Sequence, residues 1–210
     1  MRRRHYIAAL LLVPLVLLVR YVAEIGEKHP GVYTVIRVID GDTAELSGGE
    51  TIRLLGIDTP EQDEPFCDAA RQYLAELALG KAVRVELGQR KRDGYGRLLG
   101  YIYIDTILVN ARLLENGMGW LYLFPEDRMN DEQRSRLFVA QRQAMARGVG
   151  VWSLPVFMEE REYVANGATM RFHRPECESI RKMSAANRVM FASRESAMYE
   201  GYSPCRNCKP

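Results

Sequence analysis

Five short segments rich in β-branched residues restrict the fold of this chain more than any other feature. Turn residues separate several of them, such as Asp40-Gly41-Asp42 and Ser47-Gly48-Gly49-Glu50. Short runs of this kind bounded by glycine and aspartate predict β-strands joined by tight turns. The predicted strands span residues 32–39, 43–46, 51–57, 81–87 and 98–104.

Three segments with helical periodicity accompany these strands. They span residues 67–79, 110–116 and 131–147, and each is followed closely by a glycine, namely Gly80, Gly117 or Gly148. Glycine just beyond a helix is the usual stop signal. Short strands interleaved with helices predict a small closed β-barrel that carries three helices.

The N-terminus has the layout of an export signal. Arg2, Arg3 and Arg4 precede an apolar run from Tyr6 to Val19. The absence of a polar face argues against a buried helix of a globular core. We expect residues 1–26 to be an uncleaved signal anchor, with a cleaved signal peptide as the alternative. The following residues would then lie outside the cytoplasm, attached to the membrane or secreted.

Two polar stretches divide the remaining chain. Residues 27–31 end in Pro-Gly, and residues 153–162 contain Pro155 and a run of charged residues. We therefore predict a barrel domain over residues 32–153 and a small α+β module over residues 163–210. A unit as short as that module usually needs a metal ion or a disulfide bond.

The chain as a whole carries a net charge of only +2, so any nucleic-acid site must be local. Polar clusters at three predicted strand ends provide candidates. Asp42 and Asp58 are hard oxygen ligands suited to Ca²⁺ or Mg²⁺, and a backbone carbonyl near Thr59 adds a further ligand. Glu61 follows Pro60, where it could orient or deprotonate a water molecule.

Two arginines complete this set of residues. Arg53 and Arg97 are suited to bind a phosphate and to stabilise the negative charge that develops when a phosphodiester is hydrolysed. Taken singly, each motif has an ordinary explanation, because Asp-Gly is a common turn and Asp-Thr-Pro-Glu is typical of a helix start. Their combination indicates a metal-dependent phosphodiesterase.

The same motifs, in the same order, resemble the staphylococcal nuclease (thermonuclease-like) family between Val35 and Ser153. The matching segments are residues 39–43, 53–61, 93–98 and 148–153. The resemblance implies an OB-fold barrel of five strands and three helices. It also implies Ca²⁺ bound by Asp42, Asp58 and the Thr59 carbonyl, and a nuclease acting on DNA or RNA.

The resemblance also assigns catalytic and substrate-binding roles. Glu61 is implied as the general base, Arg53 and Arg97 as phosphate ligands, and Tyr95 and Tyr122 as substrate-binding residues. A non-catalytic nucleic-acid-binding barrel is the alternative function, because a fold does not fix an activity. The complete acidic and arginine set favours catalysis.

Four residues near the C-terminus form a second candidate site. His173, Cys177, Cys205 and Cys208 are the donor types of a closed tetrahedral Zn²⁺ site, and their paired spacing allows chelation. A disulfide within this set is the alternative, since disulfides form outside the cytoplasm. Cys67 stands apart, and we expect it to be a buried helix residue, with pairing to a partner chain as the alternative.

Residues 171–209 resemble the zinc module of Ada-type DNA repair proteins, in which a zinc-bound cysteine accepts a methyl group. His173 stands at the acceptor position here, and an imidazole is a poor substitute for a thiolate nucleophile. We therefore expect a structural or DNA-docking module, with Arg174, Arg206 and Lys209 contacting long DNA. All predicted catalytic groups precede Trp152, so the barrel's chemistry is expected to be independent of this module.

Overall fold

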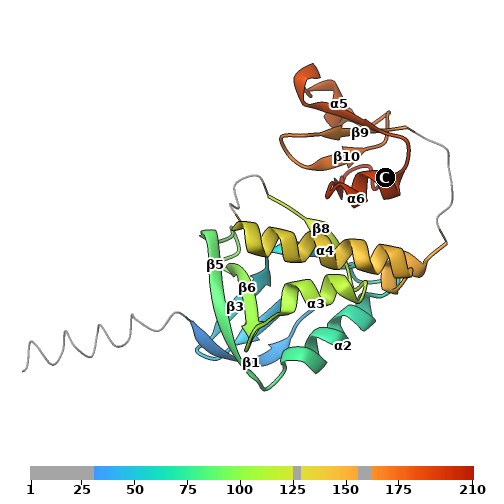
Figure 1. Ribbon diagram of the computed structural model, residues 1–210. Coiled ribbons are helices and arrows are strands. Elements are labelled where there is room, and N and C mark those ends of the chain that lie inside the picture. Colours follow the sequence, from blue (N-terminus) through green and yellow to red (C-terminus); the bar gives the residue numbers. More distant parts are fainter. Residues whose placement is uncertain (1–30, 125–128, 156–161) are drawn as a thin grey trace, which may run out of the picture.

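A computed structural model describes residues 31–124, 129–155 and 162–210 (Figure 1). The predicted N-terminal anchor, residues 1–26, lies outside the described residues, and so does most of the predicted second linker. Within the described ranges, no helix is both long enough and apolar enough to cross a membrane.

The larger domain is built on a sheet that closes on itself. Its strands are β1 (Val32–Val38), β2 (Thr43–Leu46), β3 (Glu50–Leu54), β5 (Ala82–Arg92) and β6 (Leu98–Ile104). Neighbouring strands pair in the order β3-β2-β1-β5-β6, and a parallel pairing of β3 with β6 joins the two ends. The predicted fold class, a five-stranded barrel with helices, is therefore confirmed.

Three helices cover this barrel. They are α2 (Cys67–Ala78), α3 (Val109–Glu115) and α4 (Asp131–Arg147). Their buried residues, among them Leu74, Leu113 and Leu137, join the strand residues in one apolar core. Asn130 caps the start of α4 through a capping box, and Gly148 ends it with a left-handed backbone conformation.

The third predicted strand differs from the observed structure in a way that matters for the site. It breaks after Leu54, and a separate strand β4 (Gly56–Asp58) follows. Gly56 has φ +78°, a conformation that favours glycine, so the chain turns there. Strand β4 then pairs with β8 (Trp120–Tyr122), which places Asp58 opposite Trp120.

The short strand β7 (Ile107–Leu108) and the 3-10 helix η1 (Gly150–Ser153) complete the larger domain. The C-terminal module has a second sheet, in the order β11-β9-β10-β12. Its elements are β9 (Tyr163–Asn166), β10 (Arg171–His173), α5 (Glu178–Arg181), η2 (Ala185–Asn187), β11 (Arg188–Phe191), α6 (Arg194–Tyr199) and β12 (Ser203–Pro204).

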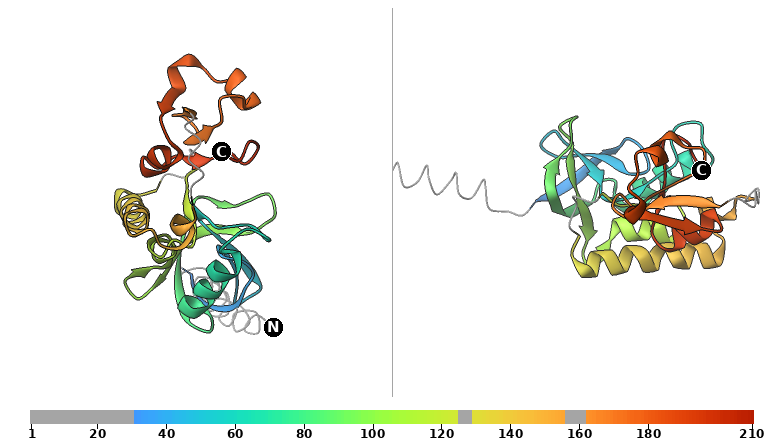
Figure 2. Two further views of the ribbon diagram at one scale, coloured as in Figure 1. Left: turned by 90° about the vertical axis from the view of Figure 1, so that its right-hand side faces the viewer. Right: turned by 90° about the horizontal axis from the view of Figure 1, so that it is seen from above.

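The module lies against one side of the barrel domain, beside α4 and β8 (Figures 1 and 2). Its apolar core includes Phe172 and Met198, and three barrel-domain side chains pack against that core: Trp120, Met145 and Trp152. The two units therefore share buried apolar surface and do not merely follow one another along the chain.

Candidate active site and metal centre

Two buried carboxylates meet where β2 begins and β4 ends. Asp42 and Asp58 are each 6% exposed, and Thr59 is 5% exposed. The Asp42 carboxylate accepts hydrogen bonds from the Thr59 backbone N–H at 3.1 Å and from the Thr59 hydroxyl at 3.2 Å. Gly41 permits this approach, because a Cβ there would lie 2.6 Å from the Thr59 hydroxyl oxygen.

Arg53 holds both carboxylates. One terminal nitrogen lies 3.0 Å from an Asp42 oxygen and 2.8 Å from an Asp58 oxygen. The other donates to the carbonyls of Leu54 and Ile57 at 2.7 and 2.9 Å. The guanidinium is therefore fixed by the turn between β3 and β4, with one edge directed at the carboxylates.

The paired carboxylates suit a cation. Burial raises the pKa of Asp42 to about 7, although the nearby Arg53 charge opposes this rise, and Asp40 and Asp58 add to it. Two negative groups withdrawn from water are costly unless positive charge is placed between them. Carboxylate oxygens such as those of Asp42 and Asp58 are the donor type that a hard divalent ion such as Ca²⁺ prefers, and the ligand set of Asp42, Asp58 and the Thr59 carbonyl stays a prediction.

A cavity of about 1160 Å³ opens over these carboxylates. Its lining contains all six of the residues to which we assigned cation binding or catalysis in the barrel: Asp42, Arg53, Asp58, Thr59, Glu61 and Arg97. Glu61 is exposed at the cavity rim. The structure therefore brings these six residues together, while their roles stay predictions.

Arg97 lines the cavity from the loop between β5 and β6, one residue before β6 begins. Its Nε donates to Asp93 at 2.8 Å, and its backbone N–H donates to the other oxygen of the same carboxylate at 3.0 Å. Asp93 thereby orients the guanidinium, and these hydrogen bonds lower the Asp93 pKa against the opposing effect of burial.

The two predicted substrate-binding tyrosines are not among the residues that line this cavity. Tyr95 is 89% exposed, beside Arg97, whose guanidinium lies 5.5 Å from its ring centre. Tyr122 is only 8% exposed, and guanidinium groups of Arg171 and Arg206 lie 3.7 and 4.8 Å from its ring centre. Their contacts with substrate stay predictions.

Two other residues differ from the sequence-based expectation. Cys67 begins α2 and is half-buried at the edge of the cavity, so the prediction of a buried helix residue is wrong. Arg206 lines the cavity as well, with a terminal nitrogen 2.7 Å from Asp58. We predicted Arg206 only as a contact for long DNA, because its spacing from Asp58 in the sequence gives no sign of their proximity.

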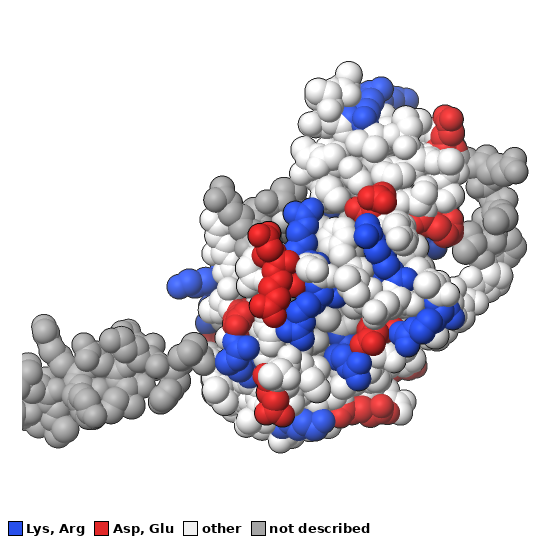
Figure 3. Space-filling model, viewed as in Figure 1, with Lys and Arg blue, Asp and Glu red and all other residues white. Residues whose placement is uncertain are grey.

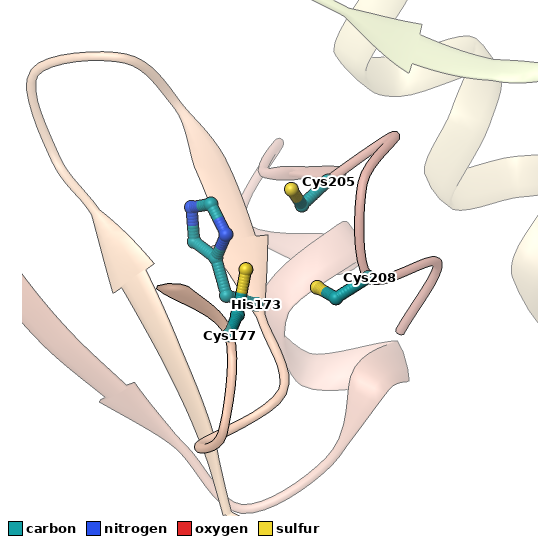
Figure 4. A group of neighbouring side chains, drawn as sticks. All are labelled: His173, Cys177, Cys205 and Cys208. Atoms are coloured by element: carbon teal, nitrogen blue, oxygen red, sulfur yellow. The ribbon is translucent and has the colours of Figure 1, made fainter. Parts of the chain in front are cut away.

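The four residues of the predicted zinc set converge in the C-terminal module (Figure 4). One ligand atom from each of His173, Cys177, Cys205 and Cys208 lies within 4.8 Å of the others, and the sulfur atoms and the imidazole face a common space. All three cysteines are free thiols, which favours the metal site over the disulfide alternative.

The surroundings of these side chains fit a metal ion. The Nδ1 atom of His173 is buried and has no hydrogen-bond partner among the described residues. Burial, followed by the Arg171 charge, lowers the His173 pKa and so favours the neutral imidazole that binds metal. Burial raises the pKa of Cys208 to about 12, and the neighbouring Cys177 and Cys205 thiols add to this rise.

The sign of the surface charge varies over the side of the molecule that Figure 3 shows. On the face shown in Figure 3, Lys and Arg side chains are interspersed with Asp and Glu. Such a surface does not attract a polyanion over a wide area. Nothing on this face therefore marks a broad basic surface for a polyanion.

Comparison with known proteins adds two family matches. Residues 51–154 match the model of the staphylococcal nuclease homologue family, and residues 156–210 match that of the metal binding domain of Ada. Together with the His/Cys cluster, the second match supports zinc binding by the C-terminal module.

Individual relatives agree with the first match. The chain is 34% identical to Protein ParB of Escherichia coli over 137 residues, which covers 60% of this chain and 74% of that protein. It is 31% identical to a thermonuclease of Staphylococcus intermedius over 129 residues, covering 57% and 75%. It is also 30% identical to Endonuclease YhcR of Bacillus subtilis over 198 residues, covering 80% of this chain but 16% of that longer protein.

Proposed function

The chain belongs to the staphylococcal nuclease homologue family, and from that premise we propose that its barrel domain hydrolyses phosphodiester bonds of DNA or RNA with the help of Ca²⁺. The observation that supports this most strongly is the meeting of Asp42, Asp58 and Arg53 at the base of one cavity. Buried carboxylates bridged by a single arginine offer sites for both a cation and a phosphate.

Asp42, Asp58 and the Thr59 carbonyl would hold the cation. Bound Ca²⁺ supplies charge neutralisation and polarisation of a phosphoryl oxygen. Glu61, exposed at the rim of the same cavity, accepts the proton of a water molecule as that water's oxygen attacks phosphorus. The bond from phosphorus to the 5′ oxygen breaks, the leaving oxygen takes a proton from solvent, and the products carry a 3′-phosphate and a 5′-hydroxyl.

The two barrel arginines act on the same phosphate. Arg53 is already fixed by its backbone contacts, and Arg97 is fixed by Asp93. Guanidinium groups held in this way need little reorganisation when charge builds on the phosphoryl oxygens, and such preorganisation is the main source of electrostatic catalysis.

Replacing Asp42 separates a nuclease from a barrel that only binds nucleic acid. Asp42→Ala should remove cleavage of single-stranded DNA, because one of the two carboxylate ligands is lost, while some binding through the arginines is retained. Cleavage and binding are measured on the same preparations. If the wild-type chain binds DNA but does not cleave it under any divalent-ion condition, the binding barrel is the better account.

For the C-terminal module we propose a Zn²⁺ ion held by His173, Cys177, Cys205 and Cys208, with no methyl-transfer activity. The chemistry of the donor set supports this, because an imidazole occupies the position at which the related repair proteins have a nucleophilic thiolate. Transfer of a methyl group from a phosphotriester substrate to the chain would contradict it.

We further propose that the enzyme acts at the cell envelope or outside the cell. The proposal depends on Arg2–Arg4 and the apolar run that follows, which favour an N-terminal membrane anchor, with secretion after cleavage as the alternative. A location outside the cytoplasm also suits Ca²⁺ as the cation, because millimolar sites are typical of extracellular Ca²⁺-binding modules.

A further inference from the structure

Arg206 extends from the C-terminal module into the cavity of the barrel. It lies between the two cysteines Cys205 and Cys208, and its terminal nitrogen is 2.7 Å from Oδ1 of Asp58. The side chain remains 58% exposed, and it lines the cavity alongside Arg53 and Glu61. A residue of the small module thus contacts Asp58, one of the proposed cation ligands.

Buried contacts hold the module in this position. The hydroxyl of Ser203, which is fully buried, donates to the Leu121 carbonyl of β8 at 2.6 Å. Gln141, 1% exposed on α4, accepts from the Leu121 N–H at 2.7 Å and donates to the Met198 carbonyl of α6 at 2.6 Å. Because β8 pairs with β4, this docking brings the Cys205–Cys208 loop beside Asp58.

Arg206 and Arg53 are equivalent in one respect. Both donate to the same Asp58 oxygen, at 2.7 and 2.8 Å. A guanidinium that binds a carboxylate presents the donor geometry that also suits a phosphate. If Arg53 binds a phosphate from this position, the guanidinium of Arg206 is suited to bind a phosphate as well.

A second cavity continues from the carboxylates into the seam between barrel and module. It measures about 360 Å³, and its lining includes Trp120, Arg194, Arg206 and Lys209 as well as Asp58. The Nε atom of Arg194 and the Nε1 atom of Trp120 are buried without hydrogen-bond partners among the described residues. The seam therefore offers an incoming ligand positive charge and free donors, beside the carboxylates of Glu61 and Glu64, the second of which pairs with Lys209 at 3.4 Å.

We propose that the C-terminal module completes the substrate site of the nuclease. Arg206 binds a phosphate of a single nucleic-acid strand at the cavity, and the seam with Lys209 and Arg194 takes the adjoining nucleotide. This inference rests on the proposed function, and it assigns to the module a direct role in binding the substrate that is cut.

Binding of a short single-stranded oligonucleotide tests the inference. The full chain is used with Ca²⁺ and with Glu61→Gln to suppress cleavage, and dissociation constants are measured over a range of salt concentrations. Arg206→Ala should weaken binding about tenfold or more, as expected for a charged hydrogen bond. It should also lower the slope of log K against log salt by about 0.7, the value for one phosphate contact on a single strand.

Two further variants make the result specific. Arg206→Lys keeps the charge and should keep the salt slope, but it should recover only part of the affinity because it lacks the paired donors. Arg181→Ala removes an exposed arginine of the same module that lies outside both cavities, and it should bind like the parent chain. Unchanged zinc content and melting temperature in each variant show that the module is intact.

The outcomes separate this inference from the proposed function. If the wild-type chain cleaves DNA while Arg206→Ala binds with parental affinity and salt slope, the inference is wrong and the proposed function stands. Tighter binding or faster cleavage by Arg206→Ala would show that the guanidinium obstructs the carboxylates, which also overturns it. If the wild-type chain cleaves nothing, the proposed function fails first.

Discussion

Asp58 accepts hydrogen bonds from two arginines that are far apart in the chain. Arg53 is five residues away, within a motif that the sequence displays, whereas Arg206 is 148 residues away on another domain. The first contact could be predicted, because spacing within one strand-turn-strand unit restricts where side chains lie. The second could not, because it depends on how two separately folded units dock.

The charge on Arg97 should matter most while phosphorus is being attacked. Arg97→Ala should lower the turnover number by about 10² to 10³, with a smaller effect on substrate affinity, since its contribution grows as charge develops. Steady-state kinetics of the wild type and variant measure both quantities. Arg112→Ala is the control, because Arg112 pairs with Glu115 and does not line the cavity. Near-normal turnover of Arg97→Ala would remove it from the mechanism.

Asp42 should make the stability of the metal-free protein depend on pH. Its pKa in the folded protein, about 7, lies above its ordinary value of 3.8, so the folded chain binds a proton between these values that the unfolded chain has lost. Stability should therefore fall as pH rises through this window, by up to about 1.4 kcal/mol per pH unit.

Melting temperatures measured in a chelator at several pH values test this dependence. Relative to Asp42→Asn, which cannot lose a proton, the wild type should become progressively less stable as the pH rises toward 7. Addition of Ca²⁺ should restore wild-type stability above that pH, because the ion binds the folded state. Parallel curves for the two proteins would show that Asp42 is not the responsible group.

Among the elements, one helix and two strands were predicted at their observed bounds, whereas the strands predicted over residues 51–57 and 81–87 differ from the structure. The helix Asp131–Arg147 was predicted at its observed bounds, since a polar start and Gly148 both mark its ends. The strand predicted over residues 51–57 proved to be two, β3 and β4, because the backbone turns at Gly56. That turn is what directs Asp58 and its pairing strand β8 toward the C-terminal module.

The Cys205–Cys208 loop links the metal centre to the cavity. For Cys205→Ser we therefore no longer expect the barrel's cleavage activity to be independent of the module. The variant should lose the module's zinc, about one equivalent, and the module should unfold while the barrel keeps its own core. Cleavage of short substrates by this variant should be slower than by the wild type, because the loop no longer positions Arg206. The rate should be similar to that of Arg206→Ala.

Metal analysis and limited proteolysis of the full chain measure these effects. Cys67→Ser is the matched control, since Cys67 lies on α2 away from the metal centre and its replacement should leave the zinc content unchanged. A wild-type module that contains no metal, and that shows a mass change on reduction, would instead support a disulfide involving Cys177.

At the scale of the whole molecule, the two units form one assembly on the side of β8 and α4 (Figure 2). Sequence patterns identified both units and the side chains of each site, because ligand types and motif spacing are local properties. They did not predict that Gln141 and Ser203 would join the units, since single polar residues in a helix or strand carry no sign of their distant partners.

The N-terminal segment should determine where this assembly works. The full-length chain should be found in the membrane fraction, with the barrel and module digested by protease added from outside the cytoplasmic membrane. Fractionation with an antibody to the C-terminal module measures this, and a variant without residues 1–26 should remain inside the cell. Wild-type protein found wholly in the cytoplasm would contradict the proposed location.

Digestion of linear and circular single-stranded DNA, with Ca²⁺ or with excess chelator, tests the central claim most directly. We predict that both substrates are cut only when Ca²⁺ is present, since Asp42 and Asp58 are the carboxylates proposed to bind the ion at the base of the cavity. The products should carry a 3′-phosphate. Full activity in the chelator, or products that end in a 3′-hydroxyl, would contradict the account of this site.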